Sequence, residues 1–350
     1  MRLGVSSAWV AAVAGPLLLA LAVVGILAIA LVAFGFDVTT SLHALGRGAV
    51  GSPRTFASST LVRATPLILT GLAVAIAFRA GIWNIGADGQ LLGGAAAATA
   101  MGLATGSSLG FLGIPLLLLA GAGGGALCAA GPAWLRRRFG VLEVISTIMV
   151  NFIVLFAVGY LVRGPLQEAT HVYPQSASLA PVLRLPFVLP GTRLHLGFLL
   201  AIGLAMGASW FFRATAGGFR VRVIGANAHA AAVTGRVDVA GLTSRVFLTS
   251  GAVAGLAGAV EVSGVTQALY ENLSPGYGFT AIAVALLGGL EPIGVVASGI
   301  FLGGLAAGAA AMQREAGVPA VLVSVLEAVI ILSVIGARAW MARRPRTAIT

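Results

Sequence analysis

Long apolar stretches without a charged residue follow one another along most of this chain of 350 residues. A helix needs roughly 20 mostly apolar residues to cross the hydrocarbon core of a bilayer, and several stretches reach that length. Charged residues make up 9% of the chain and apolar residues 59%, whereas a soluble domain has about 25% charged residues. The sequence therefore predicts an all-α membrane protein that crosses the lipid bilayer many times.

About ten expected transmembrane helices account for most of the chain, which is treated as a single transmembrane domain over residues 1–350. Each is a mostly apolar stretch bounded by polar, charged or turn-forming residues. The expected helices cover residues 9–33, 59–78, 87–105, 108–131, 142–163, 195–212, 241–263, 278–290, 293–311 and 319–337.

The arginines are distributed unevenly between the two sides that these helices define. Fourteen fall on one side and seven on the other, and the side with more positive charge is normally cytoplasmic. Trp9, Trp134, Trp210 and Trp340 stand at expected helix ends on the arginine-rich side, where an amphipathic ring favours the headgroup layer. Both termini are therefore expected in the cytoplasm. Because the positive charge lies in short clusters between apolar stretches, it indicates topology and not nucleic-acid binding.

Every one of the 21 basic residues is Arg, so the chain has no Lys for a phosphate-binding loop or a Schiff base. A compositional bias is enough to explain the absence of Lys, but the exclusion holds in either case. The single cysteine, Cys128, excludes an internal disulfide and a cysteine-based metal cluster. We therefore expect no cofactor or metal in this chain and no ATP hydrolysis by it.

Two loops are long enough to carry a function. The first, about residues 164–194, contains five prolines and is expected to form an ordered, irregular extracytoplasmic cap. The second, about residues 213–240, is expected in the cytoplasm. In it Asn227 favours a helix start, the Ala-rich residues 228–233 favour helix, and Gly235 favours a helix stop. The sequence predicts a short surface helix there, either a plain connector or a partner-docking helix.

Polar groups inside a membrane are costly unless they are paired or face water, so they are candidates for function. The densest set lies between Gly81 and Gln90, where three glycines favour a break in a helix at membrane depth. A second set on one helix face comprises Glu143, Ser146, Thr147 and Asn151. For the isolated Glu261, Thr280 and Glu327, both a structural hydrogen bond and a transport role remain open.

Small residues are expected to bring helix backbones close together. Small-xxx-small patterns are formed by Gly121 with Gly125, and by Gly251, Gly255 and Gly258. Such faces permit close helix contact in lipid, where apolar side chains alone give little association.

The segment Gly-Ile-Trp-Asn-Ile-Gly-Ala-Asp-Gly-Gln at residues 81–90 resembles the Phe-Asn-Ile-Gly-Ala-Glu-Gly-Gln motif of permease subunits of bacterial ABC importers for nucleosides. This branch belongs to a larger group that also holds ribose-type sugar and branched-chain amino-acid permeases. Further matches lie at residues 143–151, 225–235, 250–258 and 276–288, in the family's order. The departures are Trp83 for Phe, Asp88 for Glu, and Glu291 where Asn or His commonly precedes the proline.

The resemblance implies an ABC importer permease fold in the bacterial cell membrane and several partners. A separate ABC ATPase subunit would bind ATP and Mg, and its groove would receive a coupling helix. The residues of this coupling segment are Gly225, Asn227, Ala230, Ala231 and Gly235. The cap would receive an extracytoplasmic substrate-binding lipoprotein, and a second, different and shorter permease subunit would complete the pore.

The expected function is translocation of nucleosides by alternating access, without chemistry on the solute. The expected residues of the substrate pathway are Trp83, Asn84, Asp88, Gln90, Asn151 and Thr280. A monosaccharide or an amino acid is the alternative solute within the same family. An ion-coupled secondary transporter is the alternative from another class, and a membrane enzyme is disfavoured because no nucleophile, metal set or acid–base pair emerges.

Overall fold

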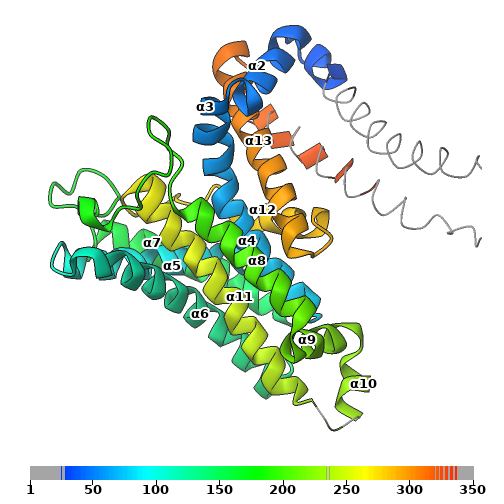
Figure 1. The fold of residues 1–350 in the computed structure, drawn as a ribbon. Helices are drawn as coiled ribbons and strands as arrows, with labels where there is room; N and C mark the ends of the chain where they lie inside the picture. Colours follow the sequence, from blue (N-terminus) through cyan, green and yellow to red (C-terminus); the bar gives the residue numbers. More distant parts are fainter. Residues whose placement is uncertain are drawn as a thin grey trace, which may run out of the picture. The chain divides into compact units, whose positions relative to one another are not determined.

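The computed structural model describes residues 25, 28–233, 235, 237–319, 321–322, 324–325, 328–329, 332–333 and 336. These residues are mostly helical and form no β-strand, only isolated bridges, which confirms the predicted all-α class (Figure 1). Most of the expected helix 9–33 and about half of the expected helix 319–337 lie outside the described residues, as do Trp9, Glu327 and Trp340.

Most helices begin and end close to the expected positions. The α-helices are α2 (Val38–Val50), α3 (Pro53–Thr55), α4 (Val62–Arg79), α5 (Ala87–Thr105), α6 (Gly113–Phe139), α7 (Glu143–Arg163), α8 (Gly197–Ala214), α9 (Ala216–Ala226), α10 (Ala228–Val233), α11 (Val239–Glu261), α12 (Tyr277–Leu287) and α13 (Pro292–Ala316). Two π-helical segments, η1 (Phe56–Leu61) and η4 (Val262–Thr266), and two 3-10 turns, η2 (Gly110–Leu112) and η3 (Pro181–Leu183), complete the described elements.

Six helical segments in the described part of the chain are long and apolar enough to cross a membrane. They are Pro53–Arg79, Gly110–Phe139, Glu143–Arg163, Gly197–Ala214, Val239–Thr266 and Pro292–Ala316. Two further helices are shorter or less apolar: α12 has 11 residues, and α5 is rich in Ala and Gly. Both lie largely inside the protein, where a helix need not be strongly hydrophobic.

The chain divides into two compact units. Residues 57–303 form the larger unit, which carries every candidate site residue. The smaller unit consists of the residues up to 56 and those from 304 onward. Within it, Asp37 caps α2 by accepting a hydrogen bond from the Thr40 amide at 2.6 Å, and Arg47 pairs with Glu315 of α13 at 2.6 Å.

Glycine contacts hold α5, α6 and α11 together in the larger unit. Gly121 and Gly125 of α6 meet Gly251 and Gly255 of α11 so closely that a Cβ at any of the four would overlap backbone or a Cβ of the facing helix. Gly94 of α5 meets the same stretch of α11. The predicted close packing of small residues is therefore confirmed. Figure 1 shows these helices side by side.

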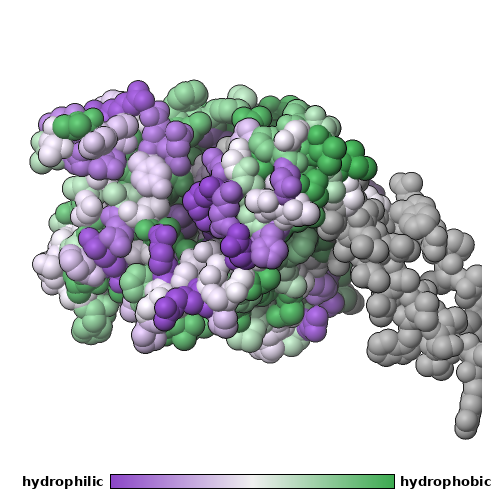
Figure 2. All heavy atoms as spheres, turned by 90° about the horizontal axis from the view of Figure 1, so that it is seen from above, coloured by the Kyte–Doolittle hydropathy of each residue, from purple (hydrophilic) through white to green (hydrophobic). Residues whose placement is uncertain are grey.

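Residues 164–196, between α7 and α8, form an ordered and irregular cap, as predicted from the prolines. Main-chain hydrogen bonds tie the cap to the end of α11 and the loop after it, from Ser176 to Leu269 at 2.8 Å and from Leu185 to Ser263 at 2.9 Å. Hydrophilic residues gather on the face seen from above in Figure 2, while hydrophobic residues are frequent along its edges.

His195 lies at the end of the cap and is fully buried. Neither ring nitrogen has a hydrogen-bond partner in the described structure, and the ring is wedged against Gly197 and Gly264. Burial, and to a lesser extent the charge of Arg193, lowers the pKa of His195 to about 4. The imidazole is therefore held neutral at physiological pH.

Candidate functional site

The chain breaks between α4 and α5, and the break lies inside the protein. The Asn84 amide donates to Gln90 Oε1 and to Ser250 Oγ, both at 2.9 Å. Ser250 in turn donates to the main-chain oxygen of Ala73 at 2.6 Å. Ala73 precedes the end of α4 by six residues, which is about 9 Å along a helix. The non-helical backbone therefore returns to the level of a residue well inside α4, as the three glycines of this segment led us to expect.

Asn151 on α7 holds the break from the other side. Its side-chain amide donates to the main-chain oxygen of Ile85 at 2.9 Å, and its Oδ1 accepts from the Gly89 amide at 2.8 Å. Both are main-chain groups that the break leaves without a helical partner, and Asn151 is only 5% exposed. One side chain thus satisfies a main-chain oxygen two residues before α5 and a main-chain amide in the first turn of α5.

Asp88 joins the first turn of α5 to the start of α12. Its Oδ1 accepts from the Ser274 hydroxyl at 2.6 Å and from the Gly278 amide at 2.9 Å. Both helices therefore direct their N-terminal ends, which carry partial positive charge, toward one carboxylate. Thr280 lies in the first turn of α12 and is half-buried. Helix N-terminal ends that meet at a polar group in the protein interior are typical of transporter sites.

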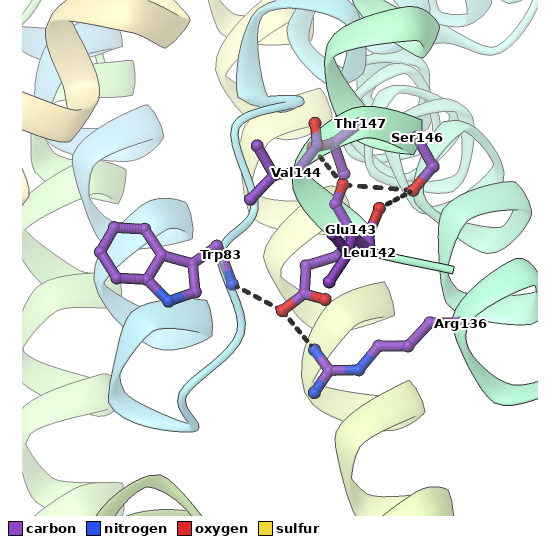
Figure 3. Close-up of polar contacts among 7 residues, drawn as sticks. All are labelled: Trp83, Arg136, Leu142, Glu143, Val144, Ser146 and Thr147. Atoms are coloured by element: carbon purple, nitrogen blue, oxygen red, sulfur yellow. Dashed lines mark hydrogen bonds and ion pairs between the residues drawn. The ribbon is translucent and has the colours of Figure 1, made fainter. Parts of the chain in front are cut away.

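Trp83 is held by its backbone, while its ring is exposed. The Trp83 amide donates to Glu143 Oε1 at 3.3 Å, and the same carboxylate oxygen accepts from Arg136 at 2.6 Å (Figure 3). The indole is 57% exposed and points away from Glu143 in Figure 3, toward the side where Phe78 contacts it. Glu143 at the start of α7 therefore fixes the chain just before Asn84.

A second ionic cluster holds the end of α4. Arg79 forms an ion pair with Glu291, and its guanidinium stacks over the Phe212 ring at 4.7 Å from the ring centroid. Arg213 lies 3.6 Å from the other carboxylate oxygen of Glu291. Glu291, which departs from the nucleoside-permease pattern, thus connects α4 and α8 to the turn between α12 and α13.

The short helix predicted after Asn227 is present as α10. Asn227 Oδ1 accepts from the Ala230 amide at 2.9 Å, and Gly235 has a φ of +65° after the helix. Gly225 packs directly on the main-chain oxygen of Arg79, where a Cβ would overlap it. Ala231 is 2% exposed and belongs to a buried cluster with Ile82, Ile224 and Phe247.

The expected residues thus fall into three groups. Asn84, Gln90, Asn151 and Asp88 are all engaged in holding the interrupted helices, and Asn84 and Gln90 are fully buried. Trp83 and Thr280 lie beside this core with side chains that take no part in it. In the coupling segment, Ala231 faces the protein, whereas Gly225, Asn227, Ala230 and Gly235 are exposed.

Sequence reasoning missed two hydroxyls that complete this core. Ser250 connects Asn84 to α4, and Ser274 connects Asp88 to the loop before α12. Ser250 begins the small-residue segment 250–258, so its position in that segment was the available indication. Among the described residues, no group of His, Cys, Asp and Glu has the arrangement of a metal site.

Helix ends that meet at buried polar groups inside a polytopic helical protein are a feature of membrane transport proteins. Residues 56–335 match the family described as branched-chain amino acid transport system / permease component, and the chain belongs to this family. It is the membrane-embedded, multi-pass permease component of an ABC transporter of the cell membrane, without catalytic activity of its own. Family membership implies a separate ATPase and a substrate-binding protein as partners.

The chain is 39% identical to the guanosine ABC transporter permease protein NupP of Bacillus subtilis, over 86% of each chain. It is 36% identical to the glucose ABC transporter permease protein TsgB13 of Haloferax volcanii, over 79% of this chain and 75% of that one. It is 31% identical to the nucleoside ABC transporter permease protein NupB of Lactococcus lactis, over 87% of this chain and 85% of that one. No solved structure matches the chain.

Proposed function

We propose that this permease carries nucleosides into the cell by alternating access. The observation that carries the proposal is the 39% identity to a guanosine transporter permease over 86% of both chains. The motif at residues 81–90 supports it, because its Asn84, Asp88 and Gln90 build the interrupted-helix core described above. No chemistry on the solute is required, and ATP with Mg is bound by the partner ATPase.

The orientation proposed from the arginines places α9 and α10 in the cytoplasm and the cap outside. In this arrangement α5, α12 and the two stretches 9–33 and 319–337, which the sequence predicts as helices, add to the six spans to give about ten, with both termini inside. An extracytoplasmic binding lipoprotein docks on the cap, and a second, shorter permease completes the pore. Conformational switching between outward and inward openings then follows ATP binding by the partner.

The contacts of α9 and α10 support their role in coupling. The buried cluster that contains Ala231 also contains Ile82, two residues before Asn84. Gly225 rests on the end of α4, next to the chain segment that leads into the break. Motion of the α9–α10 segment would therefore act directly on residues 80–86. The exposed residues Asn227, Ala228, Ala230 and Ala232 form the surface that we assign to the ATPase groove.

A glucose-type monosaccharide is the second candidate, favoured by the 36% identity to a glucose transporter permease. The deciding experiment is uptake of radiolabelled guanosine, adenosine and glucose by cells that express the permease together with its ATPase, second permease and binding protein. ATP-dependent uptake of nucleosides in preference to glucose is expected. Glucose uptake without nucleoside uptake would overturn the proposal, and uptake that persists without the ATPase would overturn the coupling.

A further inference from the structure

A polar recess of about 200 Å³ opens in the larger unit, apart from the Asn84 core. Its polar lining comes from five elements. Ser58 and Ser59 belong to η1, Arg63 to α4, Arg193 to the cap, Glu261 to the end of α11, and Tyr277 to the start of α12.

The two π-helical segments of the described structure both line this recess. The π-helical segment η1 provides its two serines, and η4 follows Glu261 and provides Val265. A π-helical turn costs regular hydrogen bonding, and such turns occur frequently at functional sites. Their presence in the lining of one recess indicates that helix geometry is adjusted here to direct polar side chains inward.

Glu261 is the unusual member of the lining. It is 5% exposed, yet no described residue forms a hydrogen bond or ion pair with its carboxylate. Arg63 and Arg193 line the same recess without reaching it. A nearly buried carboxylate with unfilled acceptor positions is costly unless a partner fills them. The alternative of a structural hydrogen bond between helices, which the sequence left open for Glu261, finds no support in these contacts.

The recess borders the cap and the start of α12, and hydrogen bonds join its lining to both. The Arg193 amide donates to Ser58 Oγ at 3.3 Å, so the cap closes onto η1 at its edge. At the start of α12, the Tyr277 amide donates to Ser274 Oγ at 3.0 Å, and Ser274 donates to Asp88. Occupation of the recess therefore bears on the cap and on the meeting point of α5 and α12.

We propose that this recess holds the transported solute, and that Glu261 accepts two adjacent hydrogen bonds from it while the arginines donate to neighbouring acceptors. The inference rests on the proposed function, because a nucleoside offers this chemistry in two places. Guanine presents adjacent N–H donors beside a carbonyl oxygen, and ribose presents a cis-diol. A volume of about 200 Å³ is smaller than the about 300–1,000 Å³ of sites that enclose drug-sized ligands, so the recess takes one end of the nucleoside, its base or its ribose.

Protection of an introduced cysteine tests the recess in the complete transporter with its binding protein. In a Cys128→Ala background, Ser59→Cys reports from the recess and Val172→Cys from the exposed part of the cap. Guanosine at ten times its Kd is expected to slow thiol labelling of Ser59→Cys about tenfold by mass action, and to leave Val172→Cys unchanged. Adding Glu261→Gln is expected to raise the guanosine concentration needed for protection about tenfold, as the loss of a bidentate contact predicts.

Analogues separate the two sources of the donor pair. Protection by 2′,3′-dideoxyguanosine but not adenosine assigns Glu261 to the base, and the reverse assigns it to the ribose. Absence of protection by every nucleoside in a transporter that still takes up guanosine would overturn the recess while leaving the proposed function intact. Absence of guanosine uptake by the parent transporter would instead overturn the proposed function. Unchanged protection in Glu261→Gln would overturn the role of the carboxylate.

Discussion

Asn84 and Gln90 bond to each other through both of their side-chain amides. Asn84 donates to Gln90 Oε1 at 2.9 Å, and Gln90 donates back to Asn84 Oδ1 at 3.1 Å. Both side chains are fully buried, so this reciprocal pair closes the turn that leads into α5 without help from water. The amides hold the interrupted helix in the conformation described, and a solute reaches them only if the pair opens.

Removing the Asn151 side chain is expected to destabilise the break. Asn151→Ala leaves the Gly89 amide and the Ile85 oxygen unpaired and buried, at a cost of about 1–3 kcal/mol for each group. Thermal unfolding of the purified permease should show a lower midpoint, and uptake should fall with it. Thr249→Ala, which removes an exposed hydroxyl bonded only to its own helix, is the control. An unchanged midpoint for Asn151→Ala would contradict the clamp.

Glu143 should respond in a graded way to substitution. Glu143→Gln keeps an acceptor for the Trp83 amide and loses the charge that faces Arg136, so a loss below about 1 kcal/mol is expected. Glu143→Ala also leaves the Trp83 amide unpaired and should cost about 1–3 kcal/mol. Unfolding midpoints of the two variants give the comparison. Equal losses would show that the backbone contact contributes nothing.

The Arg79–Glu291 pair should show measurable coupling, and the neighbouring Arg213 should not. Arg79 is 11% exposed and Glu291 47%, so solvent weakens the pair and about 1 kcal/mol is expected from a double-mutant cycle with Arg79→Gln and Glu291→Gln. Arg213, at 3.6 Å and 67% exposed, should couple to Glu291 by close to zero. A larger coupling of Glu291 to Arg213 than to Arg79 would show that Arg213 is the main partner of Glu291.

Two neighbouring alanines of α10 should separate docking from folding. Ala230 is exposed, so Ala230→Arg should leave the amount of folded permease unchanged and abolish solute-stimulated ATPase activity of the assembled transporter. Ala231 is buried beside Ile82 and Phe247, so Ala231→Arg should lower the amount of folded protein itself. Ala230→Ser serves as the conservative control. Normal transport by Ala230→Arg would refute the proposed contact with the ATPase.

Acid should destabilise the protein through His195. Its folded pKa of about 4 lies below the ordinary histidine pKa of 6.5, so the unfolded chain binds the proton more readily. Stability from this group is fully present above pH 6.5, falls as the pH drops, and levels off below pH 4, with a total loss of about 3 kcal/mol. Unfolding midpoints at pH 7.5 and 5 should differ less in His195→Gln than in the parent. His171→Gln, at an exposed site, should behave like the parent.

Much of the larger unit was predictable because its pattern is local. The lengths of apolar runs located α7, α8 and α11 within a few residues, and Asn227 with Gly235 located α10. Spaced glycines indicated the contacts of α6 with α11. The break after α4 followed from three glycines beside polar residues, since such a segment is neither a good helix nor a good loop.

What escaped prediction depends on contacts between distant residues. The sequence places Asp88 near the start of α5, but its bond to Gly278 joins positions 190 residues apart. The burial of Ala231 was equally invisible, because every position of an Ala-rich helix has the same local character. The π-helical segments η1 and η4 have no residue pattern of their own, and α9 was not expected because its glycines disfavour a helix.

The glycine contact of α5, α6 and α11 has a mechanical consequence. Where backbones touch without intervening side chains, there are no rotamers that could rearrange to let one helix slide past the next. These three helices would therefore turn as a single rigid lever during transport. The chain joins these three helices to α4 through residues 80–86 and to α12 through residues 267–276, so any displacement relative to α4 and α12 has to be taken up in those two short stretches of chain.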